Sequence, residues 1–373
     1  MTPARASAEW PRRLESVLAD PSLLRLHFQP IVDLRRGVVA GYETLARFCE
    51  PDGQPSRVGP DRWFAAAGAQ GAGARLEGLV VRRCLELLPT VPPNCFLTVN
   101  VSPHLLTDPE LAGTLLAAPD LAPLVLELTE HQDVTELEPL LDLRDRLRSR
   151  GALLAVDDAG SGYSGLQQIA AIKPQMVKLD RAIVSGVDGD EVKLALTELL
   201  GEFAGRIDAW LLAEGLETAG ELAAFMRLGV PLGQGWVLGR PAPGFAPLAP
   251  EVVRLIKAQA ARVRLTESVA SLLRPVRQVE VGDDVDAPPP AVVVGPLGEP
   301  LELLLRDPRT AETYTAPVSP RVHPSADIAE TLQRALTRPP AQRFDPVLCT
   351  DPAGQVLGLV RVEDLASAAH VRR

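Results

Sequence analysis

Polar residues recur at the ends of apolar runs through the first two thirds of the sequence. They are Glu43, Asn100, Glu127, Asp157 with Asp158, Lys178, Glu214 with Glu217, and Gln234. Carboxylates that gather in one place repel each other and raise each other's pKa unless cations are present. Oxygen ligands with few histidines suit hard ions such as Mg²⁺ or Mn²⁺ rather than zinc. Two such ions, with a lysine to orient water, are a recurrent means of cleaving a phosphodiester.

These residues can meet only if the apolar runs are strands of one sheet. The predicted strands are 25–33, 38–47, 96–101, 124–129, 153–158, 176–180, 210–214 and 232–237. Helix-period segments stand between most of them, at 62–88 (two helices), 103–116, 138–150, 164–172, 191–205 and 219–228. This alternation predicts an α/β fold, a (β/α)₈ TIM-like barrel whose site lies at the carboxyl ends of the strands. The alternative is that these polar residues merely end strands and face water. This explanation is adequate for any single position but not for the whole set.

The first two predicted strands are joined by residues 34–37 alone. A parallel pair needs a connection of about a dozen residues or more, so this pair must be an antiparallel hairpin. The barrel should therefore have an antiparallel first strand.

The charge and the apolar content limit the classes of partner. The formal net charge of −10 argues against broad binding of DNA, RNA or an anionic membrane, which require basic surface. The first twenty residues lack the apolar region of a secretory signal, and no run approaches the roughly 18 apolar residues of a membrane span. We expect a cytoplasmic protein.

The sequence changes character beyond Pro241. A Pro-rich exit is followed by a helix-like stretch, 251–273, and then by two segments, AVVVGPLGEPLELLLRD and DPVLCTDPAGQVLGLVRVEDL. Each predicts a strand, a Gly-containing turn, a strand and a charged helix start, and the second is preceded by a strand and a helix capped near Ser325. The predicted organisation is a leader helix (1–20), a barrel (21–245), a linker helix (246–268) and a small duplicated α+β module (269–373).

An ordered set of motifs resembles the EAL-domain phosphodiesterases, which hydrolyse the bacterial second messenger cyclic di-GMP. The motifs are FQPIVDLRRGVVAGYETLARF, FLTVNVSP, LVLELTEH, LLAVDDAGSGYSGL, IKPQMVKLD, LLAEGLET and GQGWVLGRP, and they cover about residues 20–243. The resemblance implies the same barrel with a reversed first strand, hydrolysis to linear pGpG, a two-metal Mg²⁺ or Mn²⁺ site and a homodimer through the barrel.

The resemblance also implies roles for individual residues. The implied metal ligands are Glu43, Asn100, Glu127, Asp157, Asp158, Glu214 and Gln234. Lys178 would contact the attacking water, so the implied catalytic residues are Lys178, Glu214 and Glu43. The implied substrate-binding residues are Arg47, Gln29, Leu45 and Asp180. Glu130 would anchor the loop after Asp157 and Asp158, and Glu217 would support the site.

Two positions depart from the family pattern. Thr44 replaces the alanine of the signature triplet, and it should face away from Glu43 because side chains alternate along a strand. Ala159 replaces a phenylalanine in a loop that, by resemblance, arranges the second metal site and the dimer contact. We expect activity to survive both changes, at a reduced rate at most.

The C-terminal module resembles a degenerate CBS pair. This resemblance implies an adenine nucleotide as regulatory ligand, with Asp364 near its ribose, although Arg361 stands where a hydroxyl residue is usual. The alternative is a packing or dimerising appendage without a ligand.

Three functions remain open from sequence. The first is a cyclic di-GMP phosphodiesterase, and the second is a catalytically silent cyclic di-GMP receptor that signals through the C-terminal module. Silent relatives typically lose several metal ligands, whereas all stand in this sequence. The third is a phosphodiesterase for other cyclic nucleotides.

Overall fold

The computed structural model describes residues 3–129, 137–159, 169–282, 288–296, 298–307 and 310–370. The chain divides into two compact units, Met1–Gln259 and Ala260–Arg373. No helix within the described ranges is long and apolar enough to cross a membrane.

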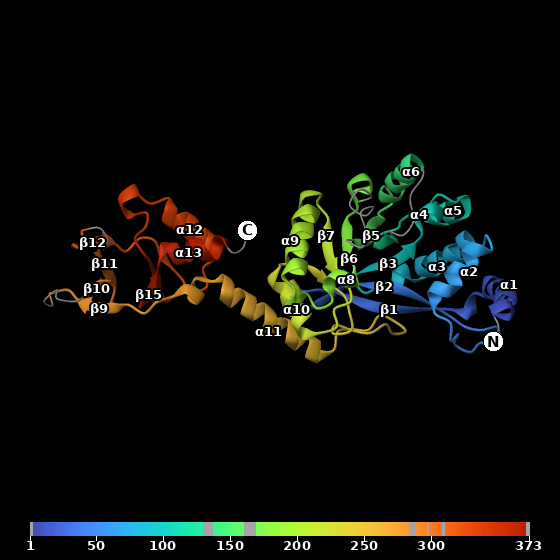
Figure 1. Ribbon diagram of the computed structural model, residues 1–373, viewed down its shortest axis with the longest axis horizontal. Helices are drawn as coiled ribbons and strands as arrows, with labels where there is room; N and C mark the ends of the chain where they lie inside the picture. Colours follow the sequence, from blue (N-terminus) through green and yellow to red (C-terminus); the bar gives the residue numbers. More distant parts are fainter. Residues whose placement is uncertain are drawn as a thin grey trace. The chain divides into compact units, whose positions relative to one another are not determined.

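The first unit is a closed barrel of eight strands that neighbour each other in chain order (Figure 1). They are β1 Leu24–Asp33, β2 Val38–Phe48, β3 Phe96–Val101, β4 Leu124–Leu128, β5 Leu153–Ala159, β6 Met176–Leu179, β7 Trp210–Ala213 and β8 Leu232–Gly233. β1 pairs antiparallel with both β2 and β8, whereas all other neighbouring pairs are parallel. The predicted barrel and its reversed first strand are confirmed.

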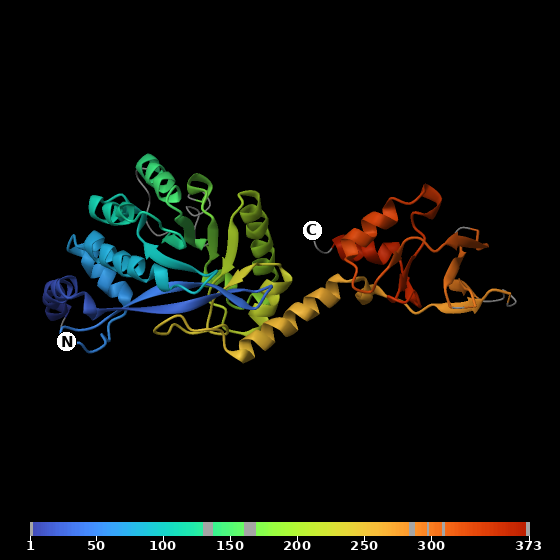
Figure 2. The ribbon, with the colours of Figure 1, turned by 180° about the vertical axis from the view of Figure 1, so that it is seen from behind.

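The turn between β1 and β2 accounts for the reversal. The Asp33 carboxylate accepts hydrogen bonds from the N–H groups of Arg35 and Arg36, at 2.9 and 3.0 Å. Gly37 has φ of +66°, which a residue with a side chain rarely adopts. The chain therefore turns back within four residues, and Figure 2 shows the resulting long β1–β2 hairpin.

Helices lie outside the barrel strands (Figures 1 and 2). They are α1 Pro3–Ala19, α2 Pro60–Ala69, α3 Gly73–Leu87, α4 Pro103–Leu106, α5 Pro109–Ala117, α6 Leu137–Arg148, α8 Arg181–Val184, α9 Glu191–Arg206, α10 Ala219–Arg227 and α11 Pro250–Glu267, with 3₁₀ turns η1 Pro21–Leu23, η2 Leu88–Thr90 and η3 Val187–Gly189. The predicted helix 103–116 is broken in two because the Asp108 side chain caps a new helix that has Pro109 at its first position. The predicted helix 164–172 falls largely outside the described residues.

The barrel interior explains where the polar side chains must lie. An apolar layer of Ile31, Val125, Ala155, Met176, Leu212 and Leu232 fills the barrel, one residue from each of six strands. Side chains two positions apart on a strand share a face. Each of these apolar residues has a polar residue two positions away on its own strand or just beyond it, always towards the same end of the barrel. The polar residues are Gln29, Glu127, Asp157, Lys178, Glu214 and Gln234. Packing of the apolar layer therefore places a polar layer at the carboxyl ends of the parallel strands.

The C-terminal unit contains two small sheets. Its elements are η4 Val269–Leu272, β9 Arg277–Glu280, β10 Ala291–Val294, β11 Pro300–Arg306, β12 Thr313–Pro317, β13 Arg321–Val322, α12 Ile328–Leu336, η5 Pro340–Gln342, β14 Val347–Thr350, β15 Val356–Val360 and α13 Val362–His370. In each half a parallel pair (β9–β10, β13–β14) is followed by an antiparallel hairpin (β10–β11, β14–β15). Both predicted strand–turn–strand segments are thus confirmed.

Two details of this unit differ from the prediction. The cap of α12 is Asp327, not Ser325, because the Asp327 carboxylate accepts the Glu330 N–H at 2.9 Å. The first hairpin is followed by β12, which extends the sheet, and not by a helix like α13.

Candidate active site

The polar ring at the barrel mouth is centred on the ammonium of Lys178. We define this ring as Glu43, Asn100, Glu127, Asp157, Lys178, Glu214 and Gln234. The Lys178 Nζ atom lies 2.5 Å from Glu214 Oε1, 2.7 Å from Glu127 Oε2, 3.3 Å from Asp157 Oδ1 and 3.9 Å from Glu43 Oε1. The Lys178 side chain is fully buried. The structure therefore brings together residues that are up to 191 positions apart in the chain (Glu43 to Gln234).

Amide side chains hold both oxygens of Glu43. Asn100 Nδ2 donates to Glu43 Oε1 at 3.1 Å, and Gln234 Nε2 donates to Glu43 Oε2 at 2.6 Å. Gln234 Nε2 also donates to Gln29 Oε1 at 3.1 Å, and Gln29 Nε2 donates to the Gly239 carbonyl at 2.9 Å. Gln29 is thus bonded at both ends of its amide and fixes the orientation of Gln234.

The ring holds more carboxylates than its one ammonium can neutralise. Burial, together with the charges of Glu43 and Asp157, raises the pKa of Glu127 to about 8 despite the opposing effect of Lys178. Burial and the neighbouring carboxylates likewise raise the pKa of Glu214 well above its usual value. Burial alone would lower the pKa of Lys178, but the four carboxylates raise it well above the usual value. Lys178 therefore keeps its proton, and the ring keeps an excess of acidic groups.

The donor set fits divalent cations in its chemistry. As the side chains stand, no three Asp, Glu, His or Cys residues of the described part converge closely enough to hold a metal ion, because the carboxylates are gathered on Lys178. However, Glu127 Oε1 and Gln234 Oε1 are buried without a hydrogen-bond partner among the described residues. A buried acceptor left unpaired costs about 1–3 kcal/mol. Unpaired oxygens beside a surplus of acidic groups are what Mg²⁺ or Mn²⁺ would satisfy.

The remaining predicted site residues take varied positions. Leu45 and Arg47 continue the face of β2 that carries Glu43, and both are half-buried. Asp180 caps α8 by accepting the Ala182 N–H at 2.7 Å, and Glu217 pairs with Arg181 at 2.8 Å. Glu130 and the side chain of Asp158 lie outside the described part of the chain.

Both departures from the family pattern are buried in strands that carry ring residues. Thr44 is buried on the outer face of β2, beside the Cys84 thiol of α3, as the alternation of the strand predicts. Ala159 is fully buried at the end of β5, where it pairs with Leu179.

Sequence reasoning missed two buried glutamates that accept backbone hydrogen bonds a few residues beyond ring members. Glu221, at the third position of α10, forms a capping box with Thr218, and the T-x-x-E spacing at 218–221 could have revealed it. Glu77, on α3, accepts hydrogen bonds from Ser102 N at 3.0 Å and Ser102 Oγ at 2.6 Å, just beyond Asn100. A glutamate inside a helix carries no comparable signal.

Replacement of Glu77 with Ala is expected to destabilise the barrel. Glu77 is only 6% exposed, and its removal leaves the Ser102 N–H without an acceptor. The expected loss is about 1–3 kcal/mol of unfolding free energy, measured by urea denaturation of the full chain. The matched control is Glu86→Ala on the same helix, whose exposed ion pair with Arg83 should contribute less than about 1 kcal/mol. Equal losses for the two variants would contradict the assigned role of Glu77.

The barrel and its polar ring define the class of protein. It is an α/β-barrel protein whose acidic site lies at the carboxyl ends of the strands, where enzymes of this architecture hold their active sites. Residues 14–241 match the family model described as the EAL domain, and the chain belongs to this family. The resemblance seen in the motifs is thereby confirmed.

Relatives with assigned activities share this domain. The cyclic di-GMP phosphodiesterase NbdA of Pseudomonas aeruginosa is 29% identical over 247 residues, which are 62% of this chain and 30% of that protein. The probable cyclic di-GMP phosphodiesterase PdeB of Escherichia coli is 29% identical over 228 residues, 58% of this chain and 42% of that protein. The chain spans about a third of the length of the curated relatives that it matches.

Solved structures agree with the fold. BlrP1 of Klebsiella pneumoniae, in a complex with manganese and cyclic di-GMP, is 26% identical with a TM-score of 0.53, covering 61% of this chain and 58% of that one. The FimX EAL domain of Xanthomonas citri, in complex with cyclic di-GMP, is 21% identical with a TM-score of 0.57, covering 65% of this chain and 98% of that one.

Proposed function

We propose that this protein is a metal-dependent phosphodiesterase that hydrolyses cyclic di-GMP to linear pGpG. The observation that carries the proposal is the buried Lys178 ammonium, held by Glu127 and Glu214 inside a ring of oxygen donors at the barrel mouth. The relatives named as cyclic di-GMP phosphodiesterases support the choice of substrate.

The chain's own residues account for the main requirements of the reaction. Divalent cations held by Glu43, Asn100, Glu127, Asp157, Glu214 and Gln234 would supply polarisation of the phosphate and a more acidic water. Lys178 keeps its ammonium charge, so its N–H groups can orient the attacking water and offset phosphate charge. Glu214 can take a proton from that water once cations favour its ionised form.

Substrate contacts are proposed for the residues that surround the ring. Arg47 lies four residues beyond Glu43 on the same face of β2, where its guanidinium can donate to phosphate oxygens. Leu45, Gln29 and Asp180 are proposed to line the substrate side. Attack of water on one phosphorus breaks its bond to the ribose 3′ oxygen, which takes up a proton and leaves as a hydroxyl, and the product is a linear dinucleotide with a terminal 5′ phosphate.

A catalytically silent cyclic di-GMP receptor is the second candidate. The described part of the ring keeps the oxygen donors that a metal-dependent enzyme needs, and this favours the enzyme.

The test compares turnover of cyclic di-GMP with that of cyclic AMP and cyclic GMP, in Mn²⁺ or Mg²⁺ and after EDTA. We expect cyclic di-GMP to be cleaved at least about a hundredfold faster in kcat/KM, which corresponds to about 2.7 kcal/mol, and EDTA to stop the reaction. Tight binding without turnover in either metal would identify a receptor. Comparable cleavage of the cyclic mononucleotides would identify a general phosphodiesterase.

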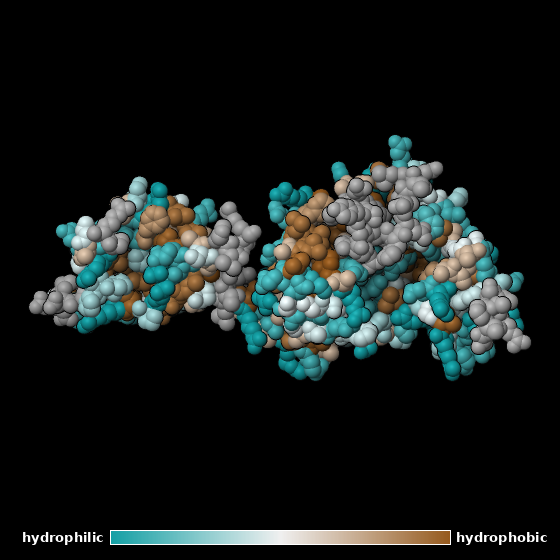
Figure 3. All heavy atoms as spheres, in the orientation of Figure 1, coloured by the Kyte–Doolittle hydropathy of each residue, from teal (hydrophilic) through white to brown (hydrophobic). Residues whose placement is uncertain are grey.

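We also propose that the barrel forms a homodimer through α9. Val192, Leu196 and Leu199 stand on one face of this helix with exposed fractions of 77%, 36% and 62%, and Figure 3 shows hydrophobic atoms gathered over α9. Contiguous exposed apolar surface of this kind marks interaction sites. Glu191 and Arg206, at opposite ends of α9, would face each other in an antiparallel pair of these helices.

The dimer is tested by analytical ultracentrifugation. Leu199→Asp is expected to give a monomer, whereas Val38→Asp, at an exposed apolar residue of β2, should leave the dimer intact. A monomeric wild type, or a Leu199→Asp variant that remains dimeric, would contradict this interface.

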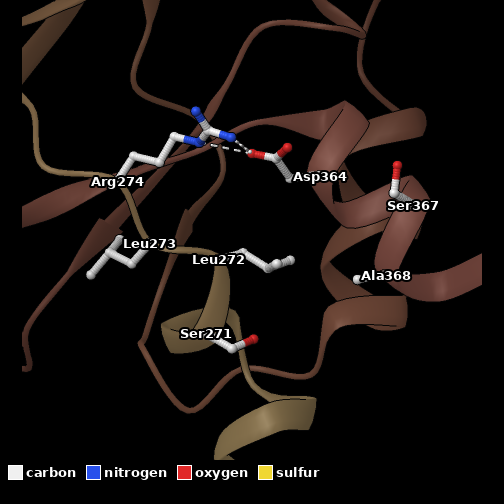
Figure 4. Close-up of a pocket in the computed structure, with 7 residues that line it drawn as sticks. All are labelled: Ser271, Leu272, Leu273, Arg274, Asp364, Ser367 and Ala368. Carbon is white, nitrogen blue, oxygen red and sulfur yellow. Dashed lines mark hydrogen bonds and ion pairs between the residues drawn. The ribbon is translucent and has the colours of Figure 1, made fainter. Parts of the chain in front are cut away.

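The C-terminal unit is proposed to act as a CBS-like pair that binds an adenine nucleotide. A cavity of about 570 Å³ lies between η4 and α13, lined by Leu272, Leu273, Ser367 and Ala368 among others (Figure 4). At its edge the Asp364 carboxylate pairs with Arg274 at 2.9 Å, so a ribose would have to compete with this guanidinium.

Calorimetric titration with ATP, ADP and AMP tests the ligand. We expect saturable binding that Asp364→Ala weakens and that Glu363→Ala, at the exposed neighbouring residue, leaves unchanged. Absence of binding to the wild type would favour the packing appendage.

A further inference from the structure

The loop that follows β7 carries Glu214 at its start and enters α10 at its end. Its backbone is fixed on one side by the end of β8, because Leu216 N donates to the Gln234 carbonyl at 3.0 Å and Val237 N donates to the Leu216 carbonyl at 3.0 Å. A Cβ atom on Gly235 would lie 2.1 Å from the Leu216 carbonyl oxygen, so only glycine allows this approach. The other side of the loop faces the segment that follows β6.

Glu221 joins that loop to the segment after β6. The residue is 4% exposed, and its carboxylate accepts three backbone hydrogen bonds, each of 2.9 Å. Oε1 accepts from Gly186 N, in the segment after β6, whereas Oε2 accepts from Glu217 N and Thr218 N, in the loop after β7. Although burial opposes it, these bonds lower the pKa of Glu221 below its usual value, so the carboxylate stays charged.

Further contacts bring the same two segments together. Arg181 pairs with Glu217 at 2.8 Å, and its side chain covers Gly215, where an added Cβ would lie 2.8 Å from Arg181 Cγ. The Asp188 side chain lies over Gly220 in the first turn of α10, where an added Cβ would lie 2.1 Å from Asp188 Oδ2. The two segments are therefore in close contact along much of their length.

The loop after β7 begins at Glu214, and the segment after β6 begins two residues beyond Lys178; these are the two ring residues that lie closest together. Lys178 is the penultimate residue of β6 and Glu214 follows β7, and Lys178 Nζ lies 2.5 Å from Glu214 Oε1. Glu214 N also donates to the Leu179 carbonyl at 3.3 Å. A displacement of one segment against the other must change this distance, and misplacement of a catalytic group by about 1 Å can lower a rate by roughly a hundredfold.

We propose that Glu221 is a positioning residue of the active site, which holds Glu214 against Lys178 by bonding the loop after β7 to the segment after β6. We call its three bonds the Glu221 clamp. The inference rests on the proposed phosphodiesterase function. It assigns Glu221 no contact with substrate or metal.

Glu221→Gln tests the clamp and spares most of the helix cap. Glutamine has one acceptor oxygen and one NH₂ donor, so it can still accept from Glu217 N and Thr218 N but presents a donor to Gly186 N. We expect kcat to fall roughly tenfold with KM changed less than about twofold. We also expect Mn²⁺ affinity, measured by electron paramagnetic resonance of free Mn²⁺, to fall roughly tenfold, as for other residues that orient metal ligands.

Thr218→Ala is the matched control for a purely structural role. It removes the hydroxyl that accepts Glu221 N at 3.1 Å and leaves the bond between Glu221 and Gly186 in place. Loss of this cap should cost about 1 kcal/mol of stability without a change in kcat or Mn²⁺ affinity. The clamp is overturned if Glu221→Gln keeps both wild-type values, or if Thr218→Ala lowers both as much. A wild type without turnover would refute the proposed function, and the Mn²⁺ titration would still decide the clamp.

Discussion

Glu43→Gln is expected to lower kcat at least about a hundredfold while leaving the fold intact. The substitution keeps the shape of the side chain and removes its charge. Both Glu43 oxygens accept amide hydrogen bonds, from Asn100 and Gln234, and a glutamine offers only one acceptor to these two donors. Substitution of residues that hydrogen-bond a metal ligand already lowers metal affinity or activity about 10- to 100-fold. Loss of the ligand's own charge should therefore lower kcat about 100-fold or more.

The measurement is kcat for cyclic di-GMP under saturating Mn²⁺, with circular dichroism to check the fold. The matched control is Thr44→Ala, the neighbouring residue, whose side chain lies on the opposite face of β2 beside Cys84. This control should stay within about twofold of wild type, since it restores an alanine that does not face the ring. If Thr44→Ala lost as much activity as Glu43→Gln, the loss would come from disturbance of β2 and not from removal of the Glu43 carboxylate.

Lys178→Met is expected both to abolish turnover and to destabilise the metal-free barrel. Methionine retains much of the apolar stem and removes the ammonium that lies within 4 Å of four carboxylates. Removal of one partner from a buried ionic group costs about 3–5 kcal/mol, because the opposite charges remain buried and uncompensated. In EDTA the melting temperature of the barrel should therefore fall by roughly 10 °C.

Calorimetric melting with and without Mn²⁺ checks this prediction. Because bound cations would replace the missing positive charge, Mn²⁺ should recover most of the lost stability in Lys178→Met but none of the turnover. The control is Lys257→Met on the exposed face of α11, where the melting temperature should change little. A Lys178→Met variant as stable as wild type in EDTA would show that the ring does not depend on this charge.

The architecture of the barrel was predictable because its signals are local. The four residues between β1 and β2 leave room only for a hairpin, and the structure shows the antiparallel first strand that follows from this. The period of two along each strand also places Glu127 beyond Val125 and Lys178 beyond Met176 on the inner face. A list of strand-end residues was therefore enough to name the members of the ring.

The arrangement within the ring was not predictable from the same signals. The Lys178 ammonium lies between the carboxylates, where an open space was equally compatible with the sequence. This placement depends on how strands far apart in the chain converge. The bonds of Glu77 to Ser102 and of Glu221 to Gly186 escaped prediction for the same reason, since each forms only after the helices pack. The cap of α12 shows a local ambiguity, because Ser325 and Asp327 are both residue types that cap helices. Only the structure shows that the Asp327 carboxylate accepts the helix N–H.

The most direct test of the account is the fate of cyclic di-GMP incubated with a small amount of the purified full chain in Mn²⁺. Chromatography with mass spectrometry would follow substrate and product over time. The account predicts that many molecules of cyclic di-GMP per protein are converted to pGpG, and that EDTA or Glu43→Gln stops the conversion. Cyclic di-GMP that stays intact while bound at one molecule per site, in Mn²⁺ and in Mg²⁺, would contradict it.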